Sequence, residues 1–169
     1  MRIVLYPDPV LLKSATPIEE LPSNLDEIRD GMRHVMNLER GIGLAAPQVG
    51  LSSRLILVNP TGEPEDEMFL LNPEITRFFG EEEWGEEGCL SFPGIYGQVL
   101  RHTHVEVSFF DCDGTEQQLV AEDLYARVLQ HEIDHLDGRI FVNRMRPSDK
   151  ILNREALEEL HRRYKEQTS

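Results

Sequence analysis

The chain has 169 residues, with 31 acidic and 17 basic side chains and a net charge of −14 at pH 7. Such a negative balance argues against non-specific binding to nucleic acids or anionic membranes. With 40% hydrophobic and 28% charged residues, the composition is that of a soluble globular protein. We expect one domain over residues 1–169. We expect it in the cytoplasm, because neither a transmembrane run nor a signal-peptide core is visible.

Two cysteines are too few for a disulfide framework. In a reducing compartment, a lone cysteine is a metal ligand, a nucleophile or a small buried side chain. We interpret Cys112, beside a predicted hairpin turn at Asp113-Gly114, as incidental. Cys89 lies in a glycine-flanked turn between strands and stays a candidate for chemistry.

The first half of the chain predicts a helix and then a segment of small residues. Prolines near residues 7–17 favour turns, and apolar residues at helical spacing predict a helix over residues 24–39, with Ser23 as N-cap and Gly41 at its end. The run Gly41-Ile42-Gly43-Leu44-Ala45-Ala46 fits the dinucleotide-binding pattern G-x-G-x-x-A, but a helix precedes it and Pro47 interrupts it, so we reject that interpretation. Its small residues instead indicate close packing against either the core or a peptide-like ligand.

The remaining segments predict mostly strands, followed by helices. We expect a buried strand at 54–58, a strand pair over 68–79 broken at Asn72-Pro73, a solvated acidic edge at 81–87, a hairpin around Asp113-Gly114, a short strand at 140–142 and a terminal helix over 153–167. This pattern indicates an α+β fold. Antiparallel or mixed sheets would pack around a central metal-binding helix, with one helix N-terminal and another C-terminal.

The central helix is predicted at residues 123–137 and contains the motif H-E-x-x-H, formed by His131, Glu132 and His135. Residues i and i+4 lie one turn apart on a helix, so both imidazoles can reach one metal ion. The intervening glutamate can then act on a water held by that metal. Fixing only three positions, the motif also occurs in helices that bind nothing.

A helical wheel strengthens the metal interpretation. Glu132 falls among apolar residues, and burying a carboxylate is costly unless a metal-bound water, a proton or a polar partner compensates it. Opposite it lies a polar sector that we predict to be the solvent face, made up of Asp123, Arg127, Gln130, Asp134 and Asp137.

The third metal ligand is left open by spacing. The metzincin extension fails because Phe141 stands where that pattern requires histidine. Glu155, 20 residues after His135, would make a thermolysin-like zinc peptidase, whereas Cys89 would complete a set of one thiolate and two imidazoles.

Three stretches together resemble the signature motifs of the peptide deformylase family, in the same order and at similar separations. They are Gly41-Ile42-Gly43-Leu44-Ala45-Ala46-Pro47-Gln48, Glu87-Gly88-Cys89-Leu90-Ser91 and Gln130-His131-Glu132-Ile133-Asp134-His135. The lead-in Tyr6-Pro7-Asp8-Pro9 is also similar to the family's N-terminus, so the resemblance covers most of the chain.

The resemblance implies a reaction and its metal site. The enzyme would hydrolyse the N-formyl group of N-formylmethionyl peptides and release formate. Cys89, His131 and His135 would bind a divalent metal, natively Fe²⁺, with Zn²⁺, Ni²⁺ or Co²⁺ also suited to this donor set. Glu132 would act as general base and then as proton donor.

The resemblance also implies how substrate is held. Gln48 and the backbone N–H of Leu90 would stabilise the oxyanion, and backbone groups of Ile42 and Gly43 would pair with the peptide. Leu124 and Val128, beside the histidines on the wheel, would suit a methionine side chain. The nascent chain would be met near the ribosome exit tunnel, which makes the ribosome a further candidate partner.

One departure concerns the outer part of the peptide site. Where some family members have an arginine that touches the substrate main chain, this sequence has Tyr96, with Arg101 further on. We hypothesise that Glu87 and Arg101 pair and brace the Cys89 turn. A non-catalytic homologue that binds formyl peptides or only a metal is the remaining alternative.

Overall fold

The computed structural model describes residues 1–169 as one antiparallel sheet and four α-helices, in the α+β arrangement expected. The strand order is β1-β2-β3-β4-β5. The strands are β1 (Gly43–Ala45), β2 (Leu55–Val58), β3 (Met68–Cys89), β4 (Phe92–Phe110) and β5 (Glu116–Glu122). The helices are α1 (Leu25–Leu38), α2 (Asp123–Leu136), α3 (Pro147–Leu152) and α4 (Arg154–Thr168).

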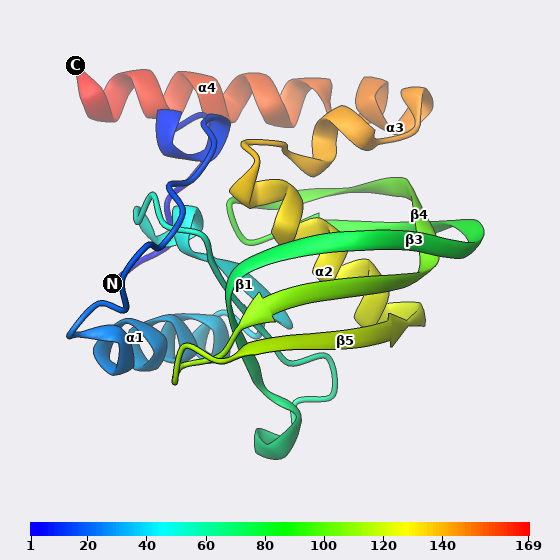
Figure 1. Ribbon diagram of the computed structural model, residues 1–169. Coiled ribbons are helices and arrows are strands. Elements are labelled where there is room, and N and C mark those ends of the chain that lie inside the picture. The colour runs from blue at the N-terminus through cyan, green and yellow to red at the C-terminus, as the bar shows by residue number, and fades with distance from the viewer.

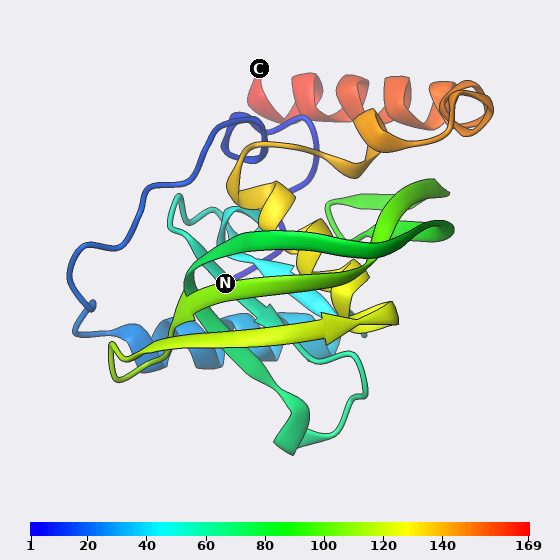
Figure 2. The same cartoon turned by 45° about the vertical axis from the view of Figure 1, so that its right-hand side comes forward.

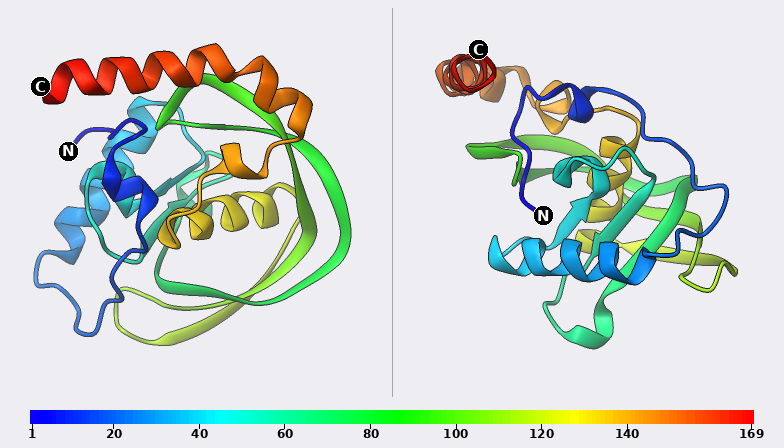
Figure 3. Two further views of the ribbon diagram at one scale, coloured as in Figure 1. Left: turned by 90° about the horizontal axis from the view of Figure 1, so that it is seen from above. Right: turned by 90° about the vertical axis from the view of Figure 1, so that its left-hand side faces the viewer.

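The sheet wraps around helix α2. Figure 1 shows α2 behind the long strands β3 and β4, and the view from above in Figure 3 shows those strands bowing around it. Apolar side chains of α2 pack on the inner face of the sheet, where every second residue of β4 points inward. The core formed there includes Ile56, Leu70, Val105, Val107, Ala126, Leu129, Ile133 and Leu136.

Two further apolar clusters hold the outer helices. Helix α1 buries Met32, Val35 and Met36 against Leu44 of β1 and Leu55 and Leu57 of β2. Helix α4 buries Leu160 against Phe92 and Phe141 in a separate cluster. Figure 2 shows α1 and α4 on opposite sides of the sheet, with α2 between them. None of the four helices is both long and apolar enough to cross a membrane.

Strand β3 is a single bent strand, so the predicted break into a strand pair is wrong. The register shifts between Leu71 and Glu74, and Asn72 adopts a positive φ of 47°. The Asn72 side chain accepts a hydrogen bond from the Ile18 N–H and donates one to the Ile18 carbonyl, each at 2.8 Å. A bulge bends a strand without ending it, so the strand continues beyond Pro73.

Three smaller predictions differ from the structure. Asn24, not Ser23, precedes α1, and it makes no side-chain cap. Residues Phe141–Arg144 form a 3-10 turn instead of a short strand, because this apolar run is buried as a connector below α4 and pairs with no strand there. The glycine-rich segment contains the short edge strand β1, which apolar alternation could not reveal over three residues.

Gly138 ends α2 in the left-handed region, with φ of 70°. A Cβ at this position would lie 2.8 Å from the Lys13 carbonyl carbon and 2.9 Å from the Leu12 carbonyl oxygen. The N-terminal segment therefore crosses directly over the end of the central helix, and only glycine leaves it room.

We predict that Gly138→Ala is more destabilising than the matched change Gly62→Ala. Gly62 also has positive φ, 82°, but no atom lies within 4 Å of its Cβ position. Gly62→Ala should therefore lower the free energy of unfolding by about 1 kcal/mol through backbone strain alone. Gly138→Ala should add about 1–3 kcal/mol for the overlap. Urea denaturation of both variants measures the difference, and equal losses would contradict the close approach.

Candidate metal centre and active site

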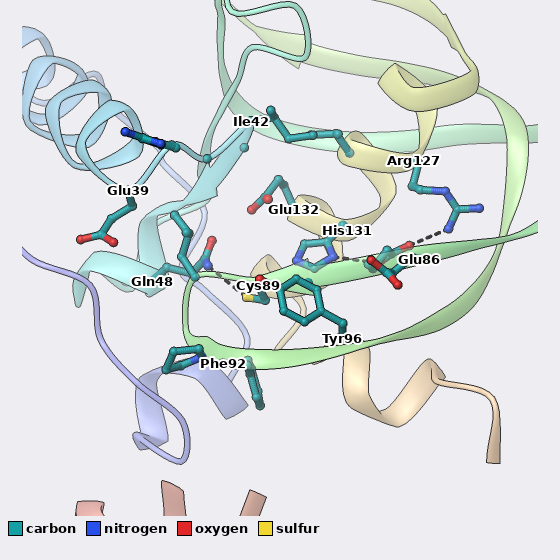
Figure 4. A pocket seen from close by; sticks show the side chains of 18 of the residues that line it. Glu39, Ile42, Gln48, Glu86, Cys89, Phe92, Tyr96, Arg127, His131 and Glu132 are labelled. Carbon is teal, nitrogen blue, oxygen red and sulfur yellow. Dashed lines mark hydrogen bonds and ion pairs between the residues drawn. The ribbon is translucent and has the colours of Figure 1, made fainter. Parts of the chain in front are cut away.

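Three candidate metal ligands meet between the end of β3 and helix α2. Cys89 is the last residue of β3, and His131 and His135 lie one turn apart on α2. One ligand atom from each can be chosen so that all lie within 4.8 Å of one another, and Cys89 Sγ is 3.3 Å from His135 Nε2. Cys89 and His131 face each other in Figure 4. The structure thus brings Cys89 together with His131 and His135. Cys89 was one of the three candidates for the third ligand that the sequence offered.

These residues fit a divalent metal. Burial holds the pKa of His135 well below its usual value, which favours the neutral imidazole that a metal ligand must be. The Nδ1 atom of His131 lies 2.8 Å from Glu87 Oε1. A metal-ligating histidine commonly donates a hydrogen bond from the N–H of its second ring nitrogen to a carboxylate in this way.

The polar sector of α2 is not the solvent face, contrary to the prediction. Gln130 and Asp134 are only 4% and 8% exposed, and only the ends of the sector, Asp123 and Asp137, are exposed. The Gln130 amide exchanges two hydrogen bonds with the backbone of His102, and Asp134 pairs with buried Arg101. Polar side chains can face a sheet when each is hydrogen-bonded, which a wheel cannot reveal.

Glu132 is buried, as predicted, and lacks a full set of partners. It is 5% exposed, and its Oε2 atom has no hydrogen-bond partner. Burial raises the pKa of Glu132 to about 7. A carboxylate with a pKa near neutrality can both take up and return a proton at physiological pH.

The glycine-rich segment packs directly against this carboxylate. A Cβ at Gly43 would lie 2.7 Å from Glu132 Oε1 and 2.9 Å from Val128 Cγ1. Close approach to α2 therefore explains why glycine stands at this position of β1.

Glu87 is the central polar residue beside the candidate metal ligands. It accepts two hydrogen bonds from Arg101 at 3.0 Å, one from Arg127 at 2.8 Å and the contact from His131. Burial alone would raise the pKa of Glu87, but the hydrogen bonds from His131 and Arg101 outweigh it and keep the pKa far below its usual value. The pairing of Glu87 with Arg101 is as hypothesised.

The contacts of Glu87 with His131 and of Arg127 with Glu87 were missed by sequence reasoning. Two signals could have pointed to them. Glu87 lies two residues before Cys89, so both side chains leave a strand on the same side. Arg127 lies four residues before His131, so it shares that face of α2.

A cavity of about 570 Å³, lined in part by β1, the end of β3 and helix α2, contains most of the predicted site. Its lining includes each predicted catalytic and substrate-binding residue, together with Cys89 and His131: Ile42, Gly43, Gln48, Leu90, Leu124, Val128 and Glu132. His135 lies deeper and does not line it. Tyr96 stands at the exposed rim, its ring against Gly88.

Gln48 is held in one orientation. Its Oε1 atom accepts a 2.9 Å hydrogen bond from the Ala45 N–H, so the amide nitrogen points at Cys89 Sγ, 3.3 Å away, and Ser91 Oγ, 3.4 Å away. The side chain is 1% exposed. Gln48 therefore presents a fixed N–H donor beside the ligand cluster.

The thermolysin-like alternative is wrong for this structure. Glu155 lies in the first turn of α4, is exposed, and is absent from the cluster of potential ligands, which is Cys89, His131 and His135. The spacing to a following helix was compatible with a ligand, but α4 packs over Phe92 instead of the histidines.

Fold and site together define a class: metallohydrolases that carry H-E-x-x-H on a buried helix. The comparisons with known proteins narrow it. A polypeptide deformylase family profile matches residues 1–151. Peptide deformylase 1B of Arabidopsis thaliana is 42% identical over 99% of this chain, which spans 62% of that protein. The peptide deformylase of Desulforudis audaxviator is 41% identical, with 85% of this chain and 92% of that protein covered.

Solved structures agree with the sequence matches. A peptide deformylase of Plasmodium falciparum superposes with a TM-score of 0.95 at 38% identity, covering 99% of both chains. This chain therefore belongs to the polypeptide deformylase family, whose members are metal-dependent hydrolases that remove the N-formyl group from nascent polypeptides. The plant relative is named as chloroplastic or mitochondrial, and the cytoplasmic location expected for this chain stays a prediction.

We predict that Glu87→Gln weakens metal binding by about 10- to 100-fold, the usual effect of losing the partner of a metal-ligating histidine. The neutral amide keeps the size of the side chain but turns an N–H₂ group toward donors of Arg101 or His131. The matched control is the neighbouring Glu86→Gln, because Glu86 is exposed and makes no side-chain hydrogen bond. Competition with a chelator, followed by metal analysis, measures both. Equal retention of metal by the two variants would contradict this role of Glu87.

Proposed function

We propose that this chain hydrolyses the N-formyl group of N-formylmethionyl peptides, with Cys89, His131 and His135 as metal ligands and Glu132 as general base. One observation carries the proposal: a buried carboxylate oxygen of Glu132 without a partner lies in the same cavity as Cys89 and His131. Unsatisfied buried carboxylates are costly, so a catalytic use accounts for this one. We also propose that residues 1–169 act as one catalytic domain.

We propose Fe²⁺ as the native metal. The support for iron is family membership, since the donor set of one thiolate and two imidazoles suits Fe²⁺, Zn²⁺, Co²⁺ and Ni²⁺ alike. When bound, such a metal lowers the pKa of a coordinated water and polarises the formyl carbonyl.

Glu132 accounts for the proton movements of the reaction. Its carboxylate takes a proton from the attacking water, holds it at Oε2, and gives it to the amine nitrogen as the C–N bond breaks. The products are formate and a free N-terminal amine. The pKa of Glu132, raised by burial to about 7, suits both steps.

Gln48 and the Leu90 backbone N–H donate to the oxygen of the formyl group as it gains negative charge. The hydrogen bond from the Ala45 N–H already orients the Gln48 amide, so its nitrogen faces the cluster of candidate ligands. One such donor contributes about 3 kcal/mol to transition-state stabilisation.

The free edge of β1 is proposed to hold the peptide. β1 pairs only with β2, and the Asn59 N–H donates to the Ile42 carbonyl across that pair at 2.8 Å. Backbone groups alternate along a strand, so those of Gly43 point to the open side. The Ile42 carbonyl, which was also expected to pair with the peptide, is already bonded to Asn59. An extended substrate can add there as a strand, with its methionine side chain between Leu124 and Val128. At the outer end of this peptide site, Tyr96 offers an aromatic ring where some family members have an arginine.

Ribosomes are a proposed partner, because the substrate is the start of a nascent chain. The expectation rests on substrate chemistry and family membership alone, and contact with the ribosome would be measured directly by co-sedimentation.

We predict formate release from formyl-Met-Ala-Ser by anaerobically purified protein with its metal quantified. Glu132→Gln should keep the metal and lose activity by about 10²–10⁴-fold, the usual contribution of a general base. Absence of formate from metal-containing wild-type protein would contradict the proposal and favour a non-catalytic homologue.

Two ligand variants serve as controls for that experiment. Cys89→Ala should lose both metal and activity, whereas Glu155→Ala should keep both, because Glu155 is exposed on α4. Metal lost only in Glu155→Ala would overturn the assignment of the ligands.

A further inference from the structure

We propose that Arg127 is a positioning residue that fixes the metal helix against the Cys89 strand and so sets the affinity for the metal. The inference rests on the proposed metal site but not on the identity of the substrate. Arg127 is placed on α2, four residues before His131, and its side chain lies on the wall of the cavity.

The guanidinium of Arg127 connects three elements. Nη1 donates to Glu87 Oε2 at 2.8 Å and to the Val99 carbonyl at 2.9 Å, and Nη2 donates to the Glu83 carbonyl at 2.8 Å. Glu83 and Glu87 belong to β3, and Val99 belongs to β4. One side chain of α2 is thus tied to the strand that ends at Cys89 and to its neighbour.

Arg127 also fixes the carboxylate that holds His131. Glu87 Oε1 contacts His131 Nδ1 at 2.8 Å, while its other oxygen receives the hydrogen bond from Arg127. Arg101 holds the same carboxylate from β4 through both oxygens. Arg101 reaches α2 only through a second carboxylate, that of Asp134, whereas Arg127 is itself a side chain of α2 and bonds Glu87 directly.

A glycine of β3 makes room for this guanidinium. A Cβ at Gly85 would lie 2.7 Å from Arg127 Cζ and 2.8 Å from Nη2. Gly85 has no positive φ, so its backbone would accept alanine without strain. Space for Arg127 is therefore the reason for glycine at this position, and a planar fork of donors is needed to reach three acceptors in different directions.

The test compares metal retention in Arg127→Met, Arg127→Lys and Gly85→Ala with wild type, each reconstituted with Co²⁺. We expect the rate of Co²⁺ loss to a chelator to rise about 10-fold or more in Arg127→Met, as for other residues that orient metal ligands. Arg127→Lys should recover part of the loss by keeping one donor to Glu87. The visible absorption of thiolate-bound Co²⁺ should change in shape in Arg127→Met, because the ligand positions change. Arg77→Met is the matched control: this β3 arginine is 61% exposed, contacts Glu106 and the Phe79 ring, and does not line the cavity.

The double variant, Gly85→Ala combined with Arg127→Met, separates the positioning role of Arg127 from a general effect on stability. Gly85→Ala should speed Co²⁺ loss in the wild-type background, where its methyl group displaces the guanidinium, but not in Arg127→Met. Unchanged Co²⁺ loss and an unchanged spectrum in Arg127→Met, or the same effect of Gly85→Ala in both backgrounds, would overturn the proposal. If Arg127→Met does not fold, Gly85→Ala and Arg127→Lys carry the same test. Failure of wild-type protein to bind Co²⁺ would instead contradict the proposed metal site.

Discussion

The carboxylate of Glu87 joins the two segments that carry the candidate metal ligands. It lies on β3, two residues before Cys89, and it contacts His131 on α2 at 2.8 Å. Two arginines, from β4 and from α2, supply the other hydrogen bonds. A buried carboxylate is destabilising without such partners and strongly orienting with them, so the position of His131 relative to the Cys89 turn depends on this one group.

The buried carboxylates around α2 are of two kinds. Some are paired and hold elements together, and one is unpaired and is proposed to act in the reaction. Glu87 and Asp134 are buried and fully paired with arginines, so they hold elements together. Glu132 is equally buried, yet one of its oxygens has no partner. Gly43 lets β1 approach that carboxylate, so the strand edge proposed to hold the peptide and the proposed base lie side by side. Close packing of a glycine segment therefore serves both the core and the site.

Sequence reasoning predicted the parts that depend on local spacing. The α2 helix, the burial of Glu132 and the α+β fold follow from helical periodicity and turn residues, and the structure agrees. The third ligand could not be chosen from spacing, because Cys89 and Glu155 were both compatible; the family resemblance favoured Cys89. The polar sector of α2 was misread because burial of Gln130 and Asp134 depends on partners 28 and 33 residues away, His102 and Arg101. The continuity of β3 past Pro73 likewise depends on Asn72 binding Ile18, a contact across 54 residues.

The central claim is that Cys89, His131 and His135 together bind the metal. X-ray absorption spectroscopy of anaerobically prepared, iron-containing protein tests this most directly, since sulfur and nitrogen ligands scatter differently and differ in distance from the metal. The account predicts one sulfur and two imidazole nitrogens in the first coordination shell, with the sulfur contribution absent from Cys89→Ser. A shell of nitrogen and oxygen alone in the wild-type protein would contradict it.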